Sequence, residues 1–124
     1  MSEYVSPSKL IEQLENNESG LTEFDLTNSY IFAPNTINQT MKRISEALKT
    51  NTHVTKLILA NNGLDDTHAA MIGDALSQNK SIQYLDLQKN KIGSAGAESI
   101  ANGLKQNTTL KEINLLSQGK GINF

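Results

Sequence analysis

The chain has 124 residues, a formal net charge of −2 and no cysteine. This length predicts one small domain with a single core, and the lack of a Lys/Arg cluster argues against nucleic-acid binding. Without cysteine there is neither a disulfide framework nor a thiolate metal site. No apolar run is long enough to span a membrane, and the first residues do not form a signal peptide. We therefore expect a cytoplasmic protein that binds neither nucleic acid nor a membrane.

The first predicted element is a helix near the N-terminus. Leu10, Ile11 and Leu14 share one face of this helix, and Ser6 or Ser8 can cap it because a short side-chain oxygen accepts a hydrogen bond from an unpaired N–H. A repeat protein must cover the apolar edge of its first repeat. Residues 1–20 are therefore expected to be a capping helix.

The remainder of the chain repeats with a period of 28 residues, most clearly from Val54 to Leu87. Large apolar residues recur at offsets 0, 3, 5 and 10 of each unit, with Asn at offset 8 in the two central units. The first unit has 33 residues because extra residues lie between Phe32 and Ile37. Self-similarity at such a period is typical of a solenoid. The predicted repeats are 21–53, 54–81 and 82–109, followed by a terminal half repeat and tail at 110–124.

Each unit reads as a strand, a turn and a helix. Residues 55–60 alternate between apolar and polar, as a strand with one buried face requires. Helices are expected at about 66–78 and 94–106, with Asp66 and Ser94 as N-caps, and the first repeat's helix should follow Pro34. Together these units predict a short right-handed α/β solenoid, a leucine-rich repeat horseshoe with parallel strands on the concave face and helices on the convex face.

Two sets of asparagines recur with the same period. Asn62 and Asn90 follow their strands and are expected to form a structural ladder, in which buried amides bond the turning backbone of neighbouring units. A second set lies just past the helices, where asparagine tolerates the left-handed backbone conformation that closes a helix. This second set consists of Asn51, Asn79 and Asn107.

The repeat pattern resembles the ribonuclease-inhibitor-like class of leucine-rich repeats and, within it, the leucine-rich domain of tropomodulin and leiomodin. The segments that carry the closer likeness are Leu21–Asn28, Ser45–Val54 and Thr108–Leu115. The resemblance implies a non-catalytic cytoskeletal protein with actin, at the pointed end of the filament, as its partner. The alternative is a generic leucine-rich repeat scaffold or regulator with another protein partner.

Function is expected on the concave face, where side chains at offsets 2, 4 and 6 of each strand point away from the core. Tyr84, Ile58 and Leu116 form an apolar patch there, and a rigid aromatic residue with a hydroxyl is a favoured interface anchor. The opposite interpretation remains open, since Glu23 and Lys56 can form an ordinary cross-strand pair and isolated exposed apolar residues are common. The predicted partner-binding residues are Tyr84, Ile58, Lys56, Asp86, Asn114 and Leu116.

Candidate catalytic residues are few. Asp65, Asp66 and His68 can be drawn as a metal or acid–base cluster, but a solvated turn with a helix cap explains them better. His53 precedes a strand and is expected to pack locally, and Arg43 falls on a helix away from the concave face. We therefore expect no enzyme activity, no metal and no cofactor.

The C-terminal strand is the other candidate surface. Residues 111–116 are expected to form an open sheet edge, and such an edge can pair with another chain. The prediction is a possible homodimer, or a partner bound at this edge. The alternatives are that Ile122 and Phe124 fold back over the edge, or that the chain is a fragment of a longer protein.

Overall fold

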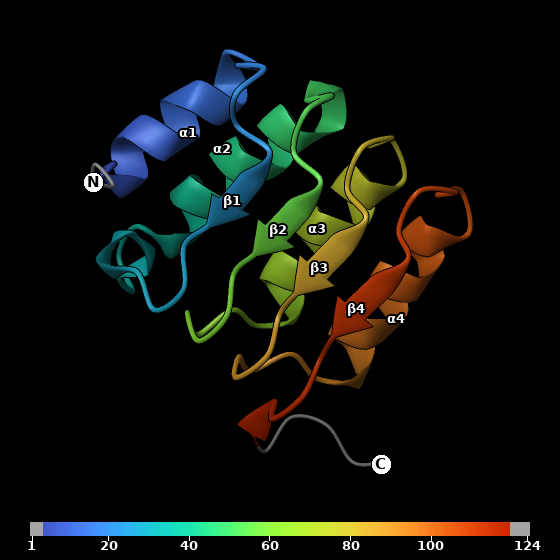
Figure 1. Ribbon diagram of the computed structural model, residues 1–124. Helices are drawn as coiled ribbons and strands as arrows, with labels where there is room; N and C mark the ends of the chain where they lie inside the picture. The colour runs from blue at the N-terminus through green and yellow to red at the C-terminus, as the bar shows by residue number, and fades with distance from the viewer. Residues whose placement is uncertain (1–3, 120–124) are drawn as a thin grey trace.

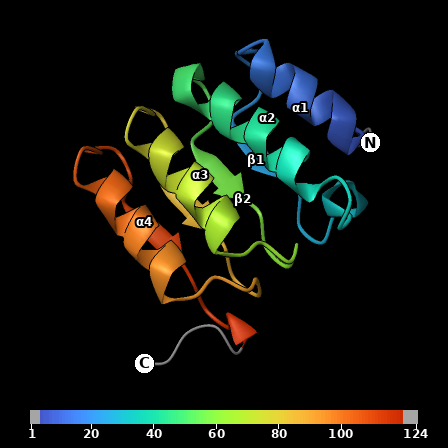
Figure 2. The same cartoon turned by 180° about the vertical axis from the view of Figure 1, so that it is seen from behind.

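The repeat units stack side by side in one layer of strands and one layer of helices, in a computed structural model that describes residues 4–119. The strands β1 (Glu23–Asp25), β2 (Lys56–Ile58), β3 (Tyr84–Asp86) and β4 (Glu112–Asn114) form one parallel sheet in chain order. Helices cover only one face of this sheet, as the two opposite views show (Figures 1 and 2). The predicted α/β solenoid is thereby confirmed.

The helices α2 (Ile37–Thr50), α3 (Asp66–Leu76) and α4 (Ser94–Leu104) each follow a strand, and α1 (Pro7–Glu15) lies beside α2 at the N-terminal end of the row (Figure 2). Helix α1 begins after Ser6, whose side chain accepts a hydrogen bond from the Lys9 N–H at 3.2 Å. The extra residues of the first repeat contain a short 3-10 helix, η1 (Tyr30–Phe32), whose Phe32 is buried. None of the helices within residues 4–119 is long and apolar enough to cross a bilayer.

The core lies between the two layers and consists of the recurring apolar residues. Leu57, Leu59, Leu85 and Leu87 are completely buried, and full burial of such side chains contributes about 1.5–3 kcal/mol each. The equivalent residues of the last strand are only half-buried, because within the described part of the chain no element packs beyond β4. Burial is therefore greatest in the middle of the solenoid.

Asn62 and Asn90 hold the turns that follow the strands. The Asn90 side chain donates to the Leu59 carbonyl at 3.0 Å, and its oxygen accepts the N–H groups of Asn62 and Leu64 at 2.8 and 3.1 Å. Gln118 makes the same bridge one repeat later, to the Ile92 N–H and the Leu87 carbonyl. The longer glutamine side chain thus replaces asparagine at this position, and it is buried.

The expectation for the second asparagine set is wrong in one respect. Asn51 has an extended backbone, with φ −68° and ψ 135°, and the left-handed residues outside glycine lie elsewhere. Asn51, Asn79 and Asn107 instead bridge neighbouring repeats, since each amide donates to the carbonyl of Leu14, Leu48 or Leu76 at 2.8–3.0 Å. The left-handed positions at the ends of the strands are Asn28, Asn61, Lys89 and Ser117.

Both predicted N-caps are displaced by one residue. The N-cap of α3 is Asp65, whose carboxylate accepts the Thr67 N–H at 2.9 Å, and that of α4 is Gly93, which has no side chain to cap with. Asp66 caps the following helix, because its carboxylate accepts the N–H groups of Gly93 and Gly96 at 2.6 and 3.1 Å. A cap supplied by the neighbouring repeat cannot be recognised from the local sequence.

Candidate functional site

The candidate surface is the concave face, the side of the sheet that the helices leave open (Figure 1). The strand register aligns side chains from the four repeats in rows across this face. The first row consists of Glu23, Lys56, Tyr84 and Glu112, and the second of Asp25, Ile58, Asp86 and Asn114. Because adjacent strands lie about 4.8 Å apart, neighbours in one row can contact the same group of a partner.

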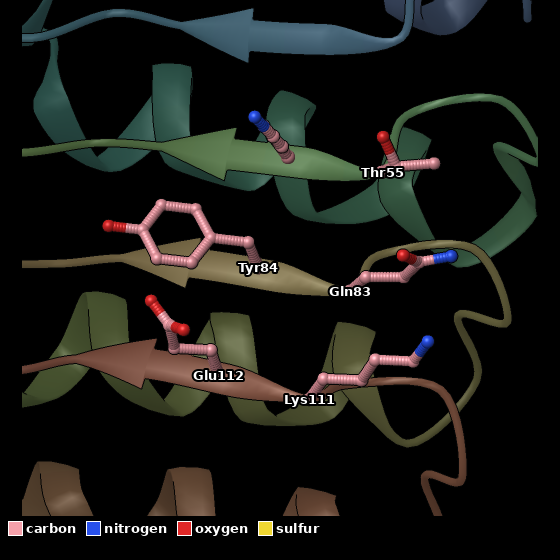
Figure 3. A pocket seen from close by; sticks show the side chains of 6 residues that line it. Thr55, Gln83, Tyr84, Lys111 and Glu112 are labelled. Carbon is pink, nitrogen blue, oxygen red and sulfur yellow. The ribbon is translucent and has the colours of Figure 1, made fainter.

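A hollow of about 460 Å³ lies at the start of β2, β3 and β4. Figure 3 shows Thr55, Gln83 and Lys111 aligned across the three strands, beside the Tyr84 ring and the Glu112 carboxylate. The hollow has room for a side chain, and it offers both charges and an aromatic surface. Its lining residues are Thr55, Lys56, Gln83, Tyr84, Lys111 and Glu112.

Tyr84 is half-buried in the middle of this hollow. Its hydroxyl donates to the Asp86 carboxylate at 3.4 Å. Burial raises the pKa of the Tyr84 phenol, and the negative charge of Asp86 raises it further. The phenol therefore stays neutral at physiological pH and presents its ring, rather than a charge, to a partner.

Side chains of the second row also hydrogen-bond the backbone just after the strands. Asp25, Asp86 and Asn114 each accept the N–H of the residue two positions later at 3.0 Å. Asp86 also accepts from the Gln88 amide and is only 6 % exposed. Asp86 is thus largely out of a partner's reach, although it orients Tyr84, whereas Asn114 and Ile58 remain half-exposed.

The three residues of the predicted apolar patch spread along the strand direction. Leu116 lies four residues beyond the register of Tyr84 and two beyond that of Ile58, roughly 13 and 7 Å along the strands at about 3.3 Å per residue. Leu116 is 69 % exposed and follows β4. Glu23 and Lys56 are neighbours in register, yet their charged groups form no ion pair within 4 Å.

Alternation along the strand did not identify three residues of the hollow, Thr55, Gln83 and Lys111. They precede three-residue strands, so the period-two rule assigns them to the buried side. The chain is still turning into the sheet there, and Gln83 and Lys111 are exposed. The available signal was their common position in the repeat, one residue before the first row.

The residues considered for catalysis have structural partners. His68 is buried, its Nδ1 accepts the Asp65 N–H at 3.0 Å, and its Nε2 lies 2.7 Å from the Asn38 side-chain oxygen. Burial lowers the pKa of His68, which keeps the imidazole neutral. Within residues 4–119 no three metal-binding side chains of the His, Cys, Asp or Glu type come together.

The other two candidates lie elsewhere on the molecule. The backbone N–H of His53 donates to the Asn51 side chain at 3.0 Å. The guanidinium of Arg43 donates to both carboxylate oxygens of Glu15, at 3.1 and 2.7 Å, on the helical side. Neither residue contributes to the concave hollow.

A family model described as the TMOD/LMOD leucine-rich domain matches residues 5–123. A solved structure of leiomodin-1 actin-binding site 2 is 34% identical, with a TM-score of 0.84 over 94% of this chain. The tropomodulin C-terminal domain of Caenorhabditis elegans is 16% identical, with a TM-score of 0.77 over 90% of the chain, and shows the fold alone.

The match covers only part of these relatives. The chain spans 65% of the leiomodin-1 structure and 64% of the tropomodulin structure. No curated protein sequence matches significantly.

Proposed function

The chain belongs to the tropomodulin/leiomodin leucine-rich domain family, and from this membership we propose that it is a non-catalytic module that binds actin. The observation that carries the proposal is the family match over residues 5–123, together with the 34% identity to a leiomodin-1 segment that is itself named an actin-binding site. Action at the pointed end of the filament is the finer part of the proposal. The cytoplasm is the corresponding location.

The concave face is the proposed contact surface. Tyr84 and Lys56 project into the hollow, and an aromatic residue that is already half-buried loses little conformational freedom when it binds. Ile58, Asn114 and Leu116 would extend the contact, and Asp86 would act by holding the Tyr84 hydroxyl. Catalysis by Asp65, Asp66 or His68 is not proposed, because all three are engaged in helix capping.

Binding to monomeric actin, followed by fluorescence anisotropy of the labelled chain, tests the proposal directly. A pointed-end elongation assay with barbed ends blocked then tests the finer claim. We expect micromolar chain to bind actin and to change the pointed-end rate. An unchanged rate with measurable binding would remove the pointed-end claim only, and an absence of binding would remove both.

Tyr84→Ala tests the concave face. Truncation of an interface anchor costs about 2 kcal/mol or more, so actin affinity should fall roughly thirtyfold. Tyr30→Ala is the matched control, because Tyr30 is a 71 % exposed tyrosine on η1, outside the concave hollow. Equal losses for the two variants would argue against the concave face as the contact surface.

A second candidate is association through the outer side of β4, with another copy of the chain or with another protein. Ile113 and Leu115 are half-buried there, whereas their equivalents Leu85 and Leu87 are fully buried. Burial of the remaining area would favour association. Ile122 and Phe124, the alternative cover considered for this edge, lie outside the described residues. Sedimentation velocity at high concentration should show a dimer that Leu116→Lys weakens, and a monomer throughout would exclude self-association.

A further inference from the structure

The first helix of the solenoid lies beside an open strand position. Helices α2, α3 and α4 each follow a strand, but within residues 4–119 the sheet begins at β1, and α1 lies beyond it at the end of the helix row (Figure 1). The Asn51 amide bonds the Leu14 carbonyl in the way that later repeats bond one another. Helix α1 therefore occupies the place of a repeat helix, without a strand of the described chain in front of it.

The packing of Leu10 shows the consequence. Leu10 precedes the bridging Leu14 by four residues, and the equivalent residues of α2, α3 and α4 are at most 2 % exposed. Those equivalents are Ile44, Ile72 and Ile100. Leu10 is only half-buried. It thus lacks part of the packing that buries its equivalents, and an apolar group can still cover it.

A hollow of about 250 Å³, here called the edge hollow, lies between the start of α1 and the end of β1. Leu10 and Pro7 line it on the side of α1, and Asp25 and Leu26 line it on the side of β1. Tyr4 and Tyr30, which are 81 % and 71 % exposed, also line it. The edge hollow has room for an apolar side chain beside Leu10.

The open edge of β1 also presents backbone hydrogen-bonding groups. The N–H groups of Leu26 and Asn28 donate to carbonyls of the β2 segment at 2.9 Å. In a parallel sheet the residues between such positions direct their N–H and C=O groups to the opposite side. The backbone groups of Glu23 and Asp25 therefore face the open edge, where an extended segment can bond them as an additional strand.

The charge of this edge is negative. Outward side chains of an added strand would lie next to Glu23 and Asp25, which are both exposed. Lys56 lies one strand further in, opposite Glu23, so the net charge of these three groups is −1. On α1, Lys9 is paired with Glu12 at 3.7 Å. An added strand with a basic residue beside Glu23 or Asp25 therefore complements the edge, since opposite charges on adjacent strands attract.

A second copy of the chain matches this edge poorly. Its β4 has an open outer side, and continuation of the repeat register would bring Glu112 beside Glu23. Like charges directly opposite one another destabilise a sheet. The next outward residue of β4, Asn114, offers no cation to Asp25.

We infer that the open edge of β1 binds an extended segment of another protein in which apolar residues alternate with lysine or arginine. The apolar residues lie next to Phe24 and Leu26, fill the edge hollow and cover Leu10. The basic residues lie next to Glu23 and Asp25 on the concave side. Binding at this edge requires no contact with actin.

Fluorescence anisotropy of a labelled peptide, Thr-Lys-Leu-Lys-Leu-Thr, titrated with the full chain at low ionic strength tests this edge. Replacement of both lysines by glutamate should weaken binding about tenfold, because each exposed charge pair changes affinity by up to about fivefold. Replacement of both leucines by serine should cost more than about tenfold. Equal affinity for the lysine and glutamate peptides, or for the leucine and serine peptides, would overturn the proposal, as would an absence of binding.

Amide hydrogen exchange locates the peptide. At saturation it should slow the exchange of the Glu23 and Asp25 N–H groups by about tenfold. Slower exchange at Ile113 and Leu115 instead would place the peptide at β4 and contradict the proposal. Protection of Glu23 and Asp25 at high protein concentration without peptide would assign the edge to a second copy.

Glu23→Pro tests the backbone contact, because proline removes an N–H that faces the edge and is tolerated on an edge strand. Peptide affinity should fall about tenfold, whereas the control Glu23→Gln keeps the N–H and should lose at most about fivefold. Equal losses would argue against an added strand.

Glu23→Gln combined with Asp25→Asn tests the charges without disturbing the turn, since Asn114 makes the same backbone bond as Asp25. This variant should bind the lysine and glutamate peptides with similar affinity. An unchanged preference for lysine would show that the two carboxylates do not select the partner.

Discussion

The contacts between successive helices, here called joints, differ sharply between α2–α3 and α3–α4. The two joints lie one 28-residue period apart, so each residue of one has an equivalent in the other. At the α3–α4 joint the contact residues are Gly73, Gly96 and Gly103. Their equivalents at the α2–α3 joint are Ser45, His68 and Ala75.

The glycines allow the backbones of α3 and α4 to touch. A Cβ atom added to Gly103 would overlap the Gly73 carbonyl oxygen, and one added to Gly73 would overlap the Ser99 carbonyl oxygen. At Gly96 an added Cβ would lie 2.6 Å from the Asp66 carboxylate. The close approach lets Asp66 accept hydrogen bonds directly from the Gly93 and Gly96 N–H groups.

At the α2–α3 joint an imidazole ring fills the corresponding space. Asn38, the equivalent of Asp66, reaches Nε2 of His68 instead of a backbone N–H. Nδ1 of His68 then accepts the Asp65 N–H, the equivalent of Gly93. The His68 side chain thus bridges a contact that the Asp66 carboxylate makes directly in the next repeat. This joint therefore contains an imidazole, whose ordinary pKa of 6.5 lies near neutral pH.

The largest expected effect is obtained by widening the α3–α4 joint. Gly103→Val places a branched side chain against the Gly73 backbone, which cannot move without shifting α3. We expect a loss of about 3 kcal/mol in unfolding free energy, the upper end for overpacked sites, measured by urea denaturation. Asn102→Val is the control. Asn102 is exposed on α4, so valine there should cost only the small helix-propensity penalty of a β-branched residue. Similar losses of unfolding free energy in the two variants would show that the close approach of Gly103 to Gly73 does not restrict the side chain at position 103.

Removal of the carboxylate cap comes next. Asp66→Ala leaves two N–H groups of α4 without an acceptor, so we expect a loss of about 1–2 kcal/mol in unfolding free energy. Asn38→Ala at the other joint should cost less, because Asn38 is exposed and water can replace its bond to His68. Urea midpoints of the two variants, compared at pH 7.5, test the order. A larger loss for Asn38→Ala would reverse the comparison.

The smallest effect is a pH dependence confined to the α2–α3 joint. Because burial places the folded-state pKa of His68 below its ordinary value of 6.5, the unfolded chain binds the proton first as the pH falls. The contribution of neutral His68 to the unfolding free energy is therefore complete above pH 6.5. It decreases as the pH falls below 6.5, until the folded-state pKa is reached. Protonated Nδ1 loses the Asp65 N–H but lies 3.0 Å from the Asp65 carboxylate, which limits the decrease. Thermal unfolding between pH 7.5 and 5 measures it.

Exchanging the chemistry of the joints isolates this effect. His68→Gly combined with Asn38→Asp recreates the α3–α4 arrangement in the α2–α3 joint. The slope of the unfolding temperature against pH, between pH 6.5 and 5, should then become flatter. The chain has only two histidines, so His53→Gln serves as the control and should keep the wild-type slope. A flatter slope in His53→Gln would show that the pH dependence comes from His53 and not from His68.

The sequence predicted the arrangement of the repeats better than their joints. Periodicity located β1, β2, β3 and β4 and the register that aligns Lys56 with Tyr84, because equivalent positions in a repeat must stack. It misassigned Asp66, since a carboxylate beside a helix start looks the same whether it caps its own helix or the next one. The residues of the candidate hollow were only partly predicted, because strand alternation does not extend beyond the strands. Lys56 and Tyr84 follow strand alternation, but Lys111 lies before its strand, where alternation does not apply.

The sequence by itself determined the family, the repeat length and the outward rows of the concave face, because these depend on the period of apolar residues along the chain. Only the tertiary structure decided how neighbouring repeats bond to one another. The Asp66 cap, the His68 relay and the hollow between Lys56 and Lys111 each join residues 27–55 positions apart. Such contacts depend on the distance between stacked backbones, and at the α3–α4 joint that distance is short because Gly73 and Gly103 have no side chains.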